Sequence, residues 1–377
     1  MIYLDHNATT PLCPPAQESL RQSLESNLFG NPSSTHAEGR RARAVIDQAR
    51  DQLAQTLGCR PSELIFTGSG TESNNLAILG LAKAHRQKGR HLICSAIEHH
   101  AVLSAAEALQ TEGYDVSLIK PDSHGTVQPD SVLEAIRPDT TLVSLMTANN
   151  ETGVIQPVEE IASACRKRNV LFHTDAVQAL GKMPLHLRLF HAVSAAAHKF
   201  QGPKGVGFLY LEGGIPLSPC LHGGAQENSR RPGTENAASI AAMAEAANFS
   251  LSKLDSGEPE RLATLRDHFE SALACIWPRC HINGLHANRL PNTSNVRFQG
   301  VSSEDMLMCL DLEGIAASSG AACMVGSIQP SHVLLAMGQS KAEATQVVRF
   351  SLGSNTTPES IHQTLAALSA IRSRLAP

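Results

Sequence analysis

A lysine beside a run of small apolar residues is the first group whose surroundings suggest chemistry. Lys199 follows His198 in HAVSAAAHKFQGPKGVGFLYL, where the alanines at 195–197 leave little polar surface nearby. An amine that forms a Schiff base must be desolvated and held close to its carbonyl partner, and these neighbours favour both conditions. Most lysines are solvated surface residues, and the competing Lys204 lies in a GPKG turn that indicates exposure. We therefore expect Lys199 to be the reactive amine.

Cys323 is the second candidate, because its neighbours in ASSGAACMVGSIQPSHVLLAMG are small and pack poorly. Such a stretch predicts an exposed loop, and an exposed cysteine that can form a thiolate is a nucleophile. No lysine, arginine or histidine flanks it closely, so groups elsewhere in the fold must activate it. The nine cysteines form no CxxC pair and their number is odd, which argues against a disulfide framework or a metal finger: Cys13, Cys59, Cys94, Cys165, Cys220, Cys275, Cys280, Cys309 and Cys323.

A glycine-rich junction in FTGSGTESNNLAI offers a place for an anion. A strand ending near Phe66 meets Gly68, Ser69, Gly70 and Thr71 before a helix begins, so backbone N–H groups, the helix dipole and the Thr71 hydroxyl could hold a phosphate. The segment matches neither a Walker loop nor a full dinucleotide fingerprint, and similar junctions serve packing in many α/β proteins. Both interpretations stay open from these residues alone.

Asp175 stands at the end of the apolar strand in VLFHTDAVQALGK, with Gln178 three residues later. Ligands of doubly wound sheets bind beyond the carboxyl ends of such strands. A carboxylate there could pair with a protonated pyridine nitrogen, the arrangement that keeps pyridoxal phosphate working as an electron sink. The alternative is an ordinary N-cap for a following helix.

Three further side chains are candidates on their local context. His99 in IEHHAV could stack on an aromatic cofactor and relay protons, and Asn150 lies in TANNETG. Arg349 ends the apolar run VVRFSLG, where its guanidinium could bind a substrate carboxylate bidentately. Structural roles, and for Arg349 a surface salt bridge, are the alternatives.

The pattern of helices and strands expected around these residues predicts an α/β fold. From about residue 40 to 250, short apolar runs alternate with amphipathic stretches, as in a parallel sheet covered by helices; the runs are ELIF, HLICSA, VSLIK, TLVSLMT, VLFHTD, HAVSAA and GVGFLYL. After about residue 252 the pattern changes to that of a smaller α+β unit. We predict a large domain over residues 13–252, and a small domain formed by 1–12 and 253–377 that carries the Cys323 loop and Arg349.

Bulk properties narrow the class of protein. A chain of 377 residues with 42% hydrophobic and 18% charged residues is an ordinary globular protein, long enough for two domains. A formal net charge of −4 leaves no basic excess for nucleic acid or an anionic membrane. The N-terminal MIYLDHNATTPL has no basic and apolar leader pattern, so we expect a cytoplasmic protein.

Together the segments resemble the cysteine desulfurases of the NifS/IscS type, a branch of the class-V aminotransferase-like enzymes of fold type I. The resemblance covers nearly the whole chain, and its most specific pieces are YLDHNATTP, FGNPSSTH, TESNNLA, NNETGVIQP, HTDAVQ, HKFQGPKG, RRPGTEN and SSGAACMVGSIQPSHVL. It implies pyridoxal 5'-phosphate as the cofactor, L-cysteine as the substrate, and a mostly parallel seven-stranded sheet in the large domain.

The resemblance also implies residue roles. Lys199 corresponds to the lysine that binds the cofactor and moves the proton of the substrate's α-carbon, and Cys323 to the cysteine that takes the sulfur as a persulfide, leaving L-alanine. The remaining implied contacts are His99 with the ring as a further catalytic group, Asp175 with the pyridine nitrogen, Gln178 with the ring hydroxyl, Gly70, Thr71 and His198 with the phosphate, Asn150 with cofactor and substrate, and Arg349 with the substrate carboxylate. Thr234 in RRPGTEN resembles a threonine that reaches the neighbouring subunit's phosphate, which implies a homodimer.

The resemblance leaves the destination of the sulfur open. A sulfur-acceptor protein such as an iron–sulfur scaffold is the expected partner, and no resident metal is expected beyond a transient iron–sulfur contact of Cys323. The alternatives are tRNA or DNA thiolation through another protein, a selenocysteine lyase-type reaction that needs Cys323 less, and a cofactor-binding protein that has lost catalysis.

Ala196 departs from the family, which usually carries a phosphate-binding serine there. One lost hydrogen bond costs about 0.5–1.5 kcal/mol, so we expect weakened but not abolished cofactor binding.

Overall fold

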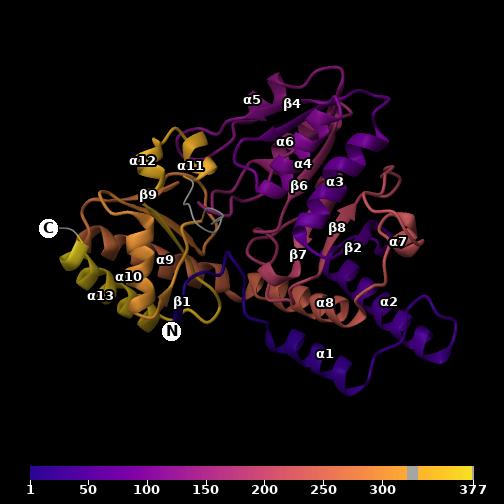
Figure 1. Ribbon diagram of the computed structural model, residues 1–377, viewed down its shortest axis with the longest axis horizontal. Helices are drawn as coiled ribbons and strands as arrows, with labels where there is room; N and C mark the ends of the chain where they lie inside the picture. The colour runs from indigo at the N-terminus through magenta and orange to yellow at the C-terminus, as the bar shows by residue number, and fades with distance from the viewer. Residues whose placement is uncertain (321–329, 376–377) are drawn as a thin grey trace.

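The computed structural model describes residues 1–320 and 330–375, and within them seven strands form a central sheet in the order β2-β8-β7-β6-β5-β3-β4 (Figure 1). The strands are β2 (Leu64–Thr67), β3 (His91–Ser95), β4 (Asp115–Ile119), β5 (Thr140–Ser144), β6 (Leu171–Asp175), β7 (Ala192–Ala196) and β8 (Gly207–Leu211). All neighbouring strands pair in parallel except at β8, which runs antiparallel to both β2 and β7. The predicted mostly parallel seven-stranded sheet is confirmed.

Helices cover both faces of the central sheet because its strands are apolar on both sides. In β2, Ile65 packs with α3 (Gly70–Ala84) and α4 (His100–Thr111), whereas the next residue, Phe66, packs with α2 (Ala37–Leu57) and α8 (Ala237–Ser252) on the opposite face. This alternation is the two-residue period of an extended strand. The helices of this unit are α1 (Pro14–Glu25), α2 (Ala37–Leu57), α3 (Gly70–Ala84), α4 (His100–Thr111), α5 (Pro129–Glu134), α6 (Val158–Lys167), α7 (Gln226–Ser229) and α8 (Ala237–Ser252), with short 3-10 turns η1 (Pro61–Glu63), η2 (Leu187–Leu189), η3 (Ala197–Lys199) and η4 (Leu254–Ser256).

A smaller unit holds its own apolar core, in which Leu4 joins Phe269, Trp277, Phe298 and Phe350. Figure 1 shows its helices α9 (Glu258–Ile276), α10 (Ser303–Leu312) and α13 (Pro358–Leu375) together on one side of the molecule, away from the central sheet. Its elements are β1 (Ile2–Tyr3), α9 (Glu258–Ile276), β9 (Cys280–Asn283), β10 (Thr293–Phe298), α10 (Ser303–Leu312), β11 (Ile315–Ala316), α11 (His332–Ala336), α12 (Lys341–Ala344), β12 (Val347–Ser351) and α13 (Pro358–Leu375). The predicted boundaries at residues 12 and 252 stay a prediction, to which the presence of Leu4 in this core lends support.

The N-terminal segment connects the two units. Strand β1 pairs in parallel with β11, and Asp5 bridges to Ser351 beside β12, all in the smaller unit. Five residues later, the Thr10 backbone N–H donates to the carbonyl of His198 at 3.0 Å, directly after β7 of the central sheet. The first ten residues therefore lie against both units.

Within the described ranges, 1–320 and 330–375, no helix combines the length and apolar character that crossing a bilayer requires.

Candidate active site

A cavity of about 380 Å³ lies at the carboxyl ends of the central strands, where β6, β7 and the helices α3 and α4 meet β12 of the smaller unit. It is lined by most of the residues that the sequence singles out: Gly70, Thr71, His99, Asn150, Asp175, Gln178, His198, Lys199 and Arg349. Residues more than two hundred positions apart are thus brought together at one sheet edge, as expected for ligand sites of this architecture.

Among the described residues, one predicted site residue does not line this cavity. Thr234 borders a separate pocket of about 80 Å³ together with Gly68 and Arg231. Cys323 lies outside the described residues, between Gly320, which lines the large cavity, and His332, which lines it as well.

Lys199 ends the short turn η3 that follows β7, and its Nζ donates to the carbonyl oxygens of Asn7 at 2.6 Å and Ala8 at 2.8 Å. Burial, and after it the charge of nearby Arg349, lower its pKa to about 8, while Asp5 acts in the opposite direction. A much larger share of this amine is therefore uncharged at neutral pH than for a solvated lysine, whose pKa is ~10.4. An uncharged desolvated amine is the form that attacks a carbonyl.

Asp175 ends β6 and is 4% exposed. Its Oδ2 accepts from the Asn74 side-chain amide at 2.6 Å, and its Oδ1 accepts from the backbone of Val177 at 2.9 Å. The bond from Val177 belongs to a turn, because residues 177–179 form a turn and not a helix, so the N-cap interpretation is wrong. A buried carboxylate held in this way offers a fixed negative charge to a cationic group in the cavity.

Both predicted histidines have lowered pKa values. The Nδ1 of His99 accepts from the Ala101 backbone at 3.1 Å as the N-cap of α4, so its proton sits on Nε2 when the ring is neutral. Burial lowers the pKa of His99, while Asp175 opposes that shift. Burial and Lys199 lower the pKa of His198 to about 4. The two rings are therefore neutral near pH 7 and contribute polarity to the cavity without charge.

Arg349 lies on β12 and is 4% exposed, which excludes the surface salt-bridge interpretation. Its Nη2 donates to Asp5 at 2.7 Å and its Nη1 to the carbonyl of Asn150 at 2.9 Å. Its Nε is buried and has no partner among the described residues. A guanidinium fixed by two partners and left with an unpaired donor is suited to an anionic group such as a carboxylate.

Helix α3 begins at the cavity and explains the glycine at residue 70. The Ser69 hydroxyl caps the helix by accepting from the Glu72 backbone at 3.1 Å. A Cβ on Gly70 would lie 2.8 Å from a methyl of Val177 and 3.1 Å from the methyl of Ala196. Packing thus requires glycine here, while the helix N-terminus still presents N–H groups and a positive dipole end to the cavity.

Several lining residues have no role in the sequence-based prediction. Asn7 and Asn74 belong to the motifs YLDHNATTP and TESNNLA, and the position of Asn74 one helical turn after Gly70 is a signal that could have identified it. His332 donates from Nε2 to the carbonyl of Glu98 at 2.9 Å, and its ring lies 4.7 Å from that of His100. No spacing rule predicts such a contact between distant segments.

Three comparisons place this geometry among known proteins. A family model described as Aminotransferase class-V matches residues 2–364. A cysteine desulfurase IscS of Dictyoglomus turgidum is 43% identical over 376 residues, which are 99% of this chain and 95% of that protein. A solved NifS-like protein has a TM-score of 0.92 at 35% identity, over 99% of this chain and 100% of its own. A structure of SspA in complex with cysteine has a TM-score of 0.81 at 36% identity, over 93% of this chain and 99% of its own.

Proposed function

Because the chain belongs to the class-V aminotransferase family and, within it, to the pyridoxal-phosphate-dependent cysteine desulfurases, we propose that the cavity holds pyridoxal phosphate and L-cysteine and that Cys323 receives the sulfur. The observation that carries the assignment of the site is the meeting of Lys199, Asp175 and Arg349 in one cavity. An amine, a buried carboxylate and a guanidinium there match the aldehyde and ring nitrogen of the cofactor and the carboxylate of an amino acid.

The residues present fit this cofactor. Lys199 supplies an amine whose lowered pKa of about 8 suits reaction with an aldehyde, and Asp175 supplies the negative charge for a protonated ring nitrogen. The start of α3 at Gly70 supplies a positive end and close approach for the phosphate. When bound, pyridoxal phosphate supplies an aldehyde for imine bonds and a ring that accepts the electron pair released at the substrate's α-carbon.

The residues of the chain then divide the remaining work. Arg349 binds the substrate carboxylate through its guanidinium, and Lys199 takes the α-proton on Nζ and returns a proton when L-alanine forms. The Cys323 thiolate attacks the sulfur of the substrate, so that an S–S bond forms as the C–S bond breaks and the enzyme keeps a persulfide. Asn7 and Ala8 hold the N–H groups of Lys199 through their carbonyl oxygens.

We also propose a homodimer with shared active sites. Thr234 lies in a separate pocket on its own chain, which is the position expected of a residue that serves another subunit's phosphate. Leu24 at the end of α1 is 81% exposed and Phe29 beyond it is 68% exposed. A second copy of the chain would cover these apolar side chains.

For the sulfur we propose transfer to an acceptor protein such as an iron–sulfur scaffold, in the cytoplasm. Every cysteine of the described residues is free, as suits a reducing compartment. Incubation of the persulfide-loaded protein with candidate scaffold proteins, and separately with tRNA- or DNA-thiolation proteins, distinguishes the pathways by which of them takes up labelled sulfur.

The decisive experiment for the reaction compares Cys323→Ala with Cys275→Ala. The second variant is the control, because it alters an exposed cysteine that has no proposed role in the reaction. With L-cysteine, we expect Cys323→Ala to form no persulfide and only background alanine, and Cys275→Ala to match the unaltered protein. Alanine and sulfide release at the original rate in Cys323→Ala would contradict the persulfide step and favour a selenocysteine lyase-type reaction. A protein that stays colourless after addition of pyridoxal phosphate would contradict the cofactor assignment.

A further inference from the structure

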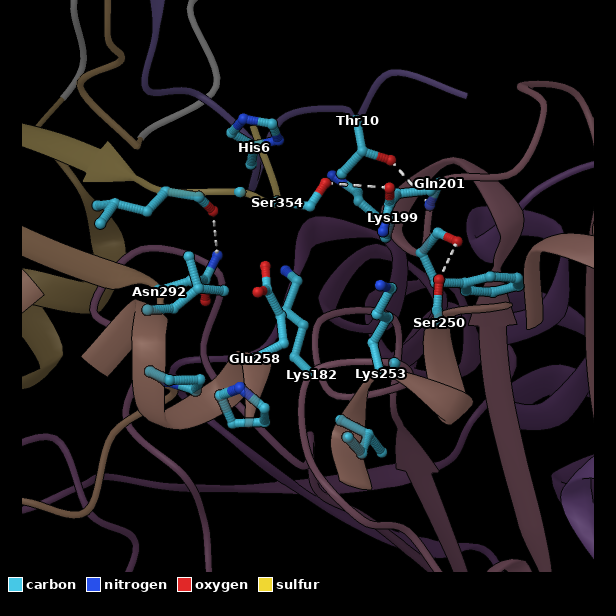
Figure 2. A pocket seen from close by; sticks show the side chains of 18 of the residues that line it. His6, Thr10, Lys182, Lys199, Gln201, Ser250, Lys253, Glu258, Asn292 and Ser354 are labelled. Carbon is cyan, nitrogen blue, oxygen red and sulfur yellow. Dashed lines mark hydrogen bonds between the residues drawn. The ribbon is translucent and has the colours of Figure 1, made fainter. Parts of the chain in front are cut away.

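A second lysine, Lys182, lies close behind Lys199 and has no role in the reaction as described so far. Its Nζ donates to the Asn7 side-chain oxygen at 3.1 Å and to Oε1 of Gln178 at 2.7 Å. It lines a small cavity of about 70 Å³ that also borders Lys199, on the side of Glu258 and Asn292. Figure 2 shows Lys182, Lys199 and Lys253 around this cavity.

Asn7 joins the two lysines. Its carbonyl oxygen accepts from Lys199 at 2.6 Å and from the amide of Gln178 at 2.9 Å. Its side-chain oxygen accepts from Lys182 and from Asn292 at 3.1 Å, and its side-chain amide donates to Thr293 at 2.9 Å. With 1% exposure and all these partners, Asn7 is held in one orientation.

Lys182 also fixes which way the amide of Gln178 points. A lysine amine that donates to Gln178 must face its oxygen, so the amide nitrogen faces Asn7. Gln178 lines the large cavity, where the proposed cofactor hydroxyl would meet the same amide group. A substitution of Lys182 is therefore expected to alter the orientation of Gln178 and the position of the Asn7 carbonyl that accepts from Lys199.

The charges around Lys182 oppose a second ammonium group. Burial lowers the pKa of Lys182 well below its usual range, and Lys199 and Arg349 lower it further. His6, Lys253 and Glu258 line the same cavity as Lys182. Of these, His6 lies near enough for Lys182 to lower the pKa of its imidazole. In the described part of the chain, the amine of Lys182 donates to two acceptors. An uncharged amine has two N–H groups, so both are paired.

We propose that Lys182 is a positioning residue of the reaction: by holding Asn7 and Gln178, it fixes the backbone oxygens on which the amine of Lys199 rests. The proposal rests on the roles proposed above for Lys199 and Gln178. Its consequence is that Lys199, after taking a proton, finds two fixed acceptors and keeps a defined position.

The experiment measures the pKa of Lys199 by NMR of the full-length protein with ¹³C-labelled lysine, with and without pyridoxal phosphate, the signal being assigned by its loss in Lys199→Arg. Lys182→Met removes both donors, and Lys182→Gln keeps two N–H donors without charge. Lys253→Met is the matched control, because Lys253 lines the same cavity while its amine lies over the ring of Phe249, 5.3 Å from the ring centre.

We expect Lys182→Met to lower the pKa of Lys199 in the cofactor-free protein by ~0.5–1 unit, because the charged amine loses fixed acceptors. We expect kcat to fall about tenfold with a smaller change in KM, Lys182→Gln to recover most of the loss, and Lys253→Met to match the unaltered protein. An unchanged Lys199 pKa and kcat in Lys182→Met would overturn the proposal, as would equal effects of Lys182→Met and Lys253→Met, or a loss in Lys182→Gln as large as that in Lys182→Met. Should Lys182→Met fail to fold, Lys182→Ala, which also removes both donors, takes its place in the comparison.

The two proposals fail in different ways. Loss of the cofactor's absorbance band in Lys199→Ala tests whether Lys199 binds the cofactor, and it does not depend on Lys182. If that band persists, the proposed role of Lys199 is wrong; if it is lost while the Lys182 variants behave like the unaltered protein, only the positioning role is wrong.

Discussion

Two backbone carbonyl oxygens, rather than an acidic side chain, hold the amine of Lys199. A carboxylate in contact with the amine would stabilise its charged form strongly, whereas neutral carbonyls do so weakly, and burial then lowers the pKa of Lys199 to about 8. Near neutral pH, both the charged and the uncharged amine are accessible. The same residue can therefore attack a carbonyl and exchange a proton.

A substitution of Ala196 tests how the cofactor phosphate is bound. Its side chain lines the cavity next to the start of α3, where the family usually carries a serine. We expect Ala196→Ser to tighten cofactor binding by about 0.5–1.5 kcal/mol, which is the net contribution of one hydrogen bond. Titration of the cofactor-free protein with pyridoxal phosphate, followed by absorbance, measures the change.

The matched control for this experiment is Ala195→Ser, one position earlier on β7. Its side chain faces the apolar core on the other side of the strand and does not line the cavity. It should destabilise the protein without strengthening cofactor binding. Equal or weaker binding in Ala196→Ser would show that the missing serine is not what limits affinity at this site.

At the scale of elements, residues at the carboxyl ends of the strands make the site. Lys199 comes after β7, Asp175 ends β6 and His99 comes after β3, so the parallel sheet brings them to one edge. The apolar runs predict these strands and hence this edge. They do not predict that β8 runs antiparallel between β2 and β7, because apolar content is the same in either direction.

Local patterns miss the contacts made by residues from other segments. Aspartate is a common N-cap residue, but Asp175 is followed by a turn and not by a helix. The residue type is the same in both cases, so only the fold shows which one applies. Lys182 and Asn7 are ordinary polar residues by composition, and their network forms because the N-terminal segment crosses to the cavity. Thr234 has a sequence motif that matches the family, although the residue lies in a different pocket of its own chain.

The junction between β2 and α3 yields a prediction about packing. Gly70→Ala would place a Cβ 2.8 Å from a methyl of Val177, so the start of α3 must shift. We expect a loss of about 1–3 kcal/mol in the free energy of unfolding, the usual range for overpacking, together with weaker cofactor binding. Urea unfolding of the cofactor-free protein and the same absorbance titration measure both.

A second substitution separates this clash from other effects. Val177→Ala removes the methyl that the new Cβ would meet, so Gly70→Ala combined with Val177→Ala should be less destabilised than the sum of the two single variants. Strict additivity would mean that the contact with Val177 is not the cause.

At the scale of the whole molecule, the proposed homodimer predicts complementation between an inactive variant and an impaired one. Lys199→Ala lacks the reactive amine, and Thr234→Ala lacks the contact proposed for the neighbouring subunit. A mixed dimer of the two should recover roughly one working site, namely that of the Thr234→Ala chain, which receives Thr234 from its partner. Activity of purified mixed dimers carrying two different tags measures this. If Thr234 instead serves its own chain's site, the mixed dimer has at most half the activity of Thr234→Ala.

The position of the first ten residues also affects how the protein matures. These residues are synthesised before their partners: β1 can pair only once Ile315 and Ala316 have been synthesised, and Asp5 only once Ser351 has. Until then, Asn7 lacks the bond from its backbone N–H to the Ser351 hydroxyl, and only contacts such as those with Gln178 and Lys182 keep it beside Lys199. The complete set of contacts around the cavity therefore forms only after residue 351 has been synthesised, so we expect a chain truncated before β12 to bind pyridoxal phosphate more weakly than the 377-residue chain.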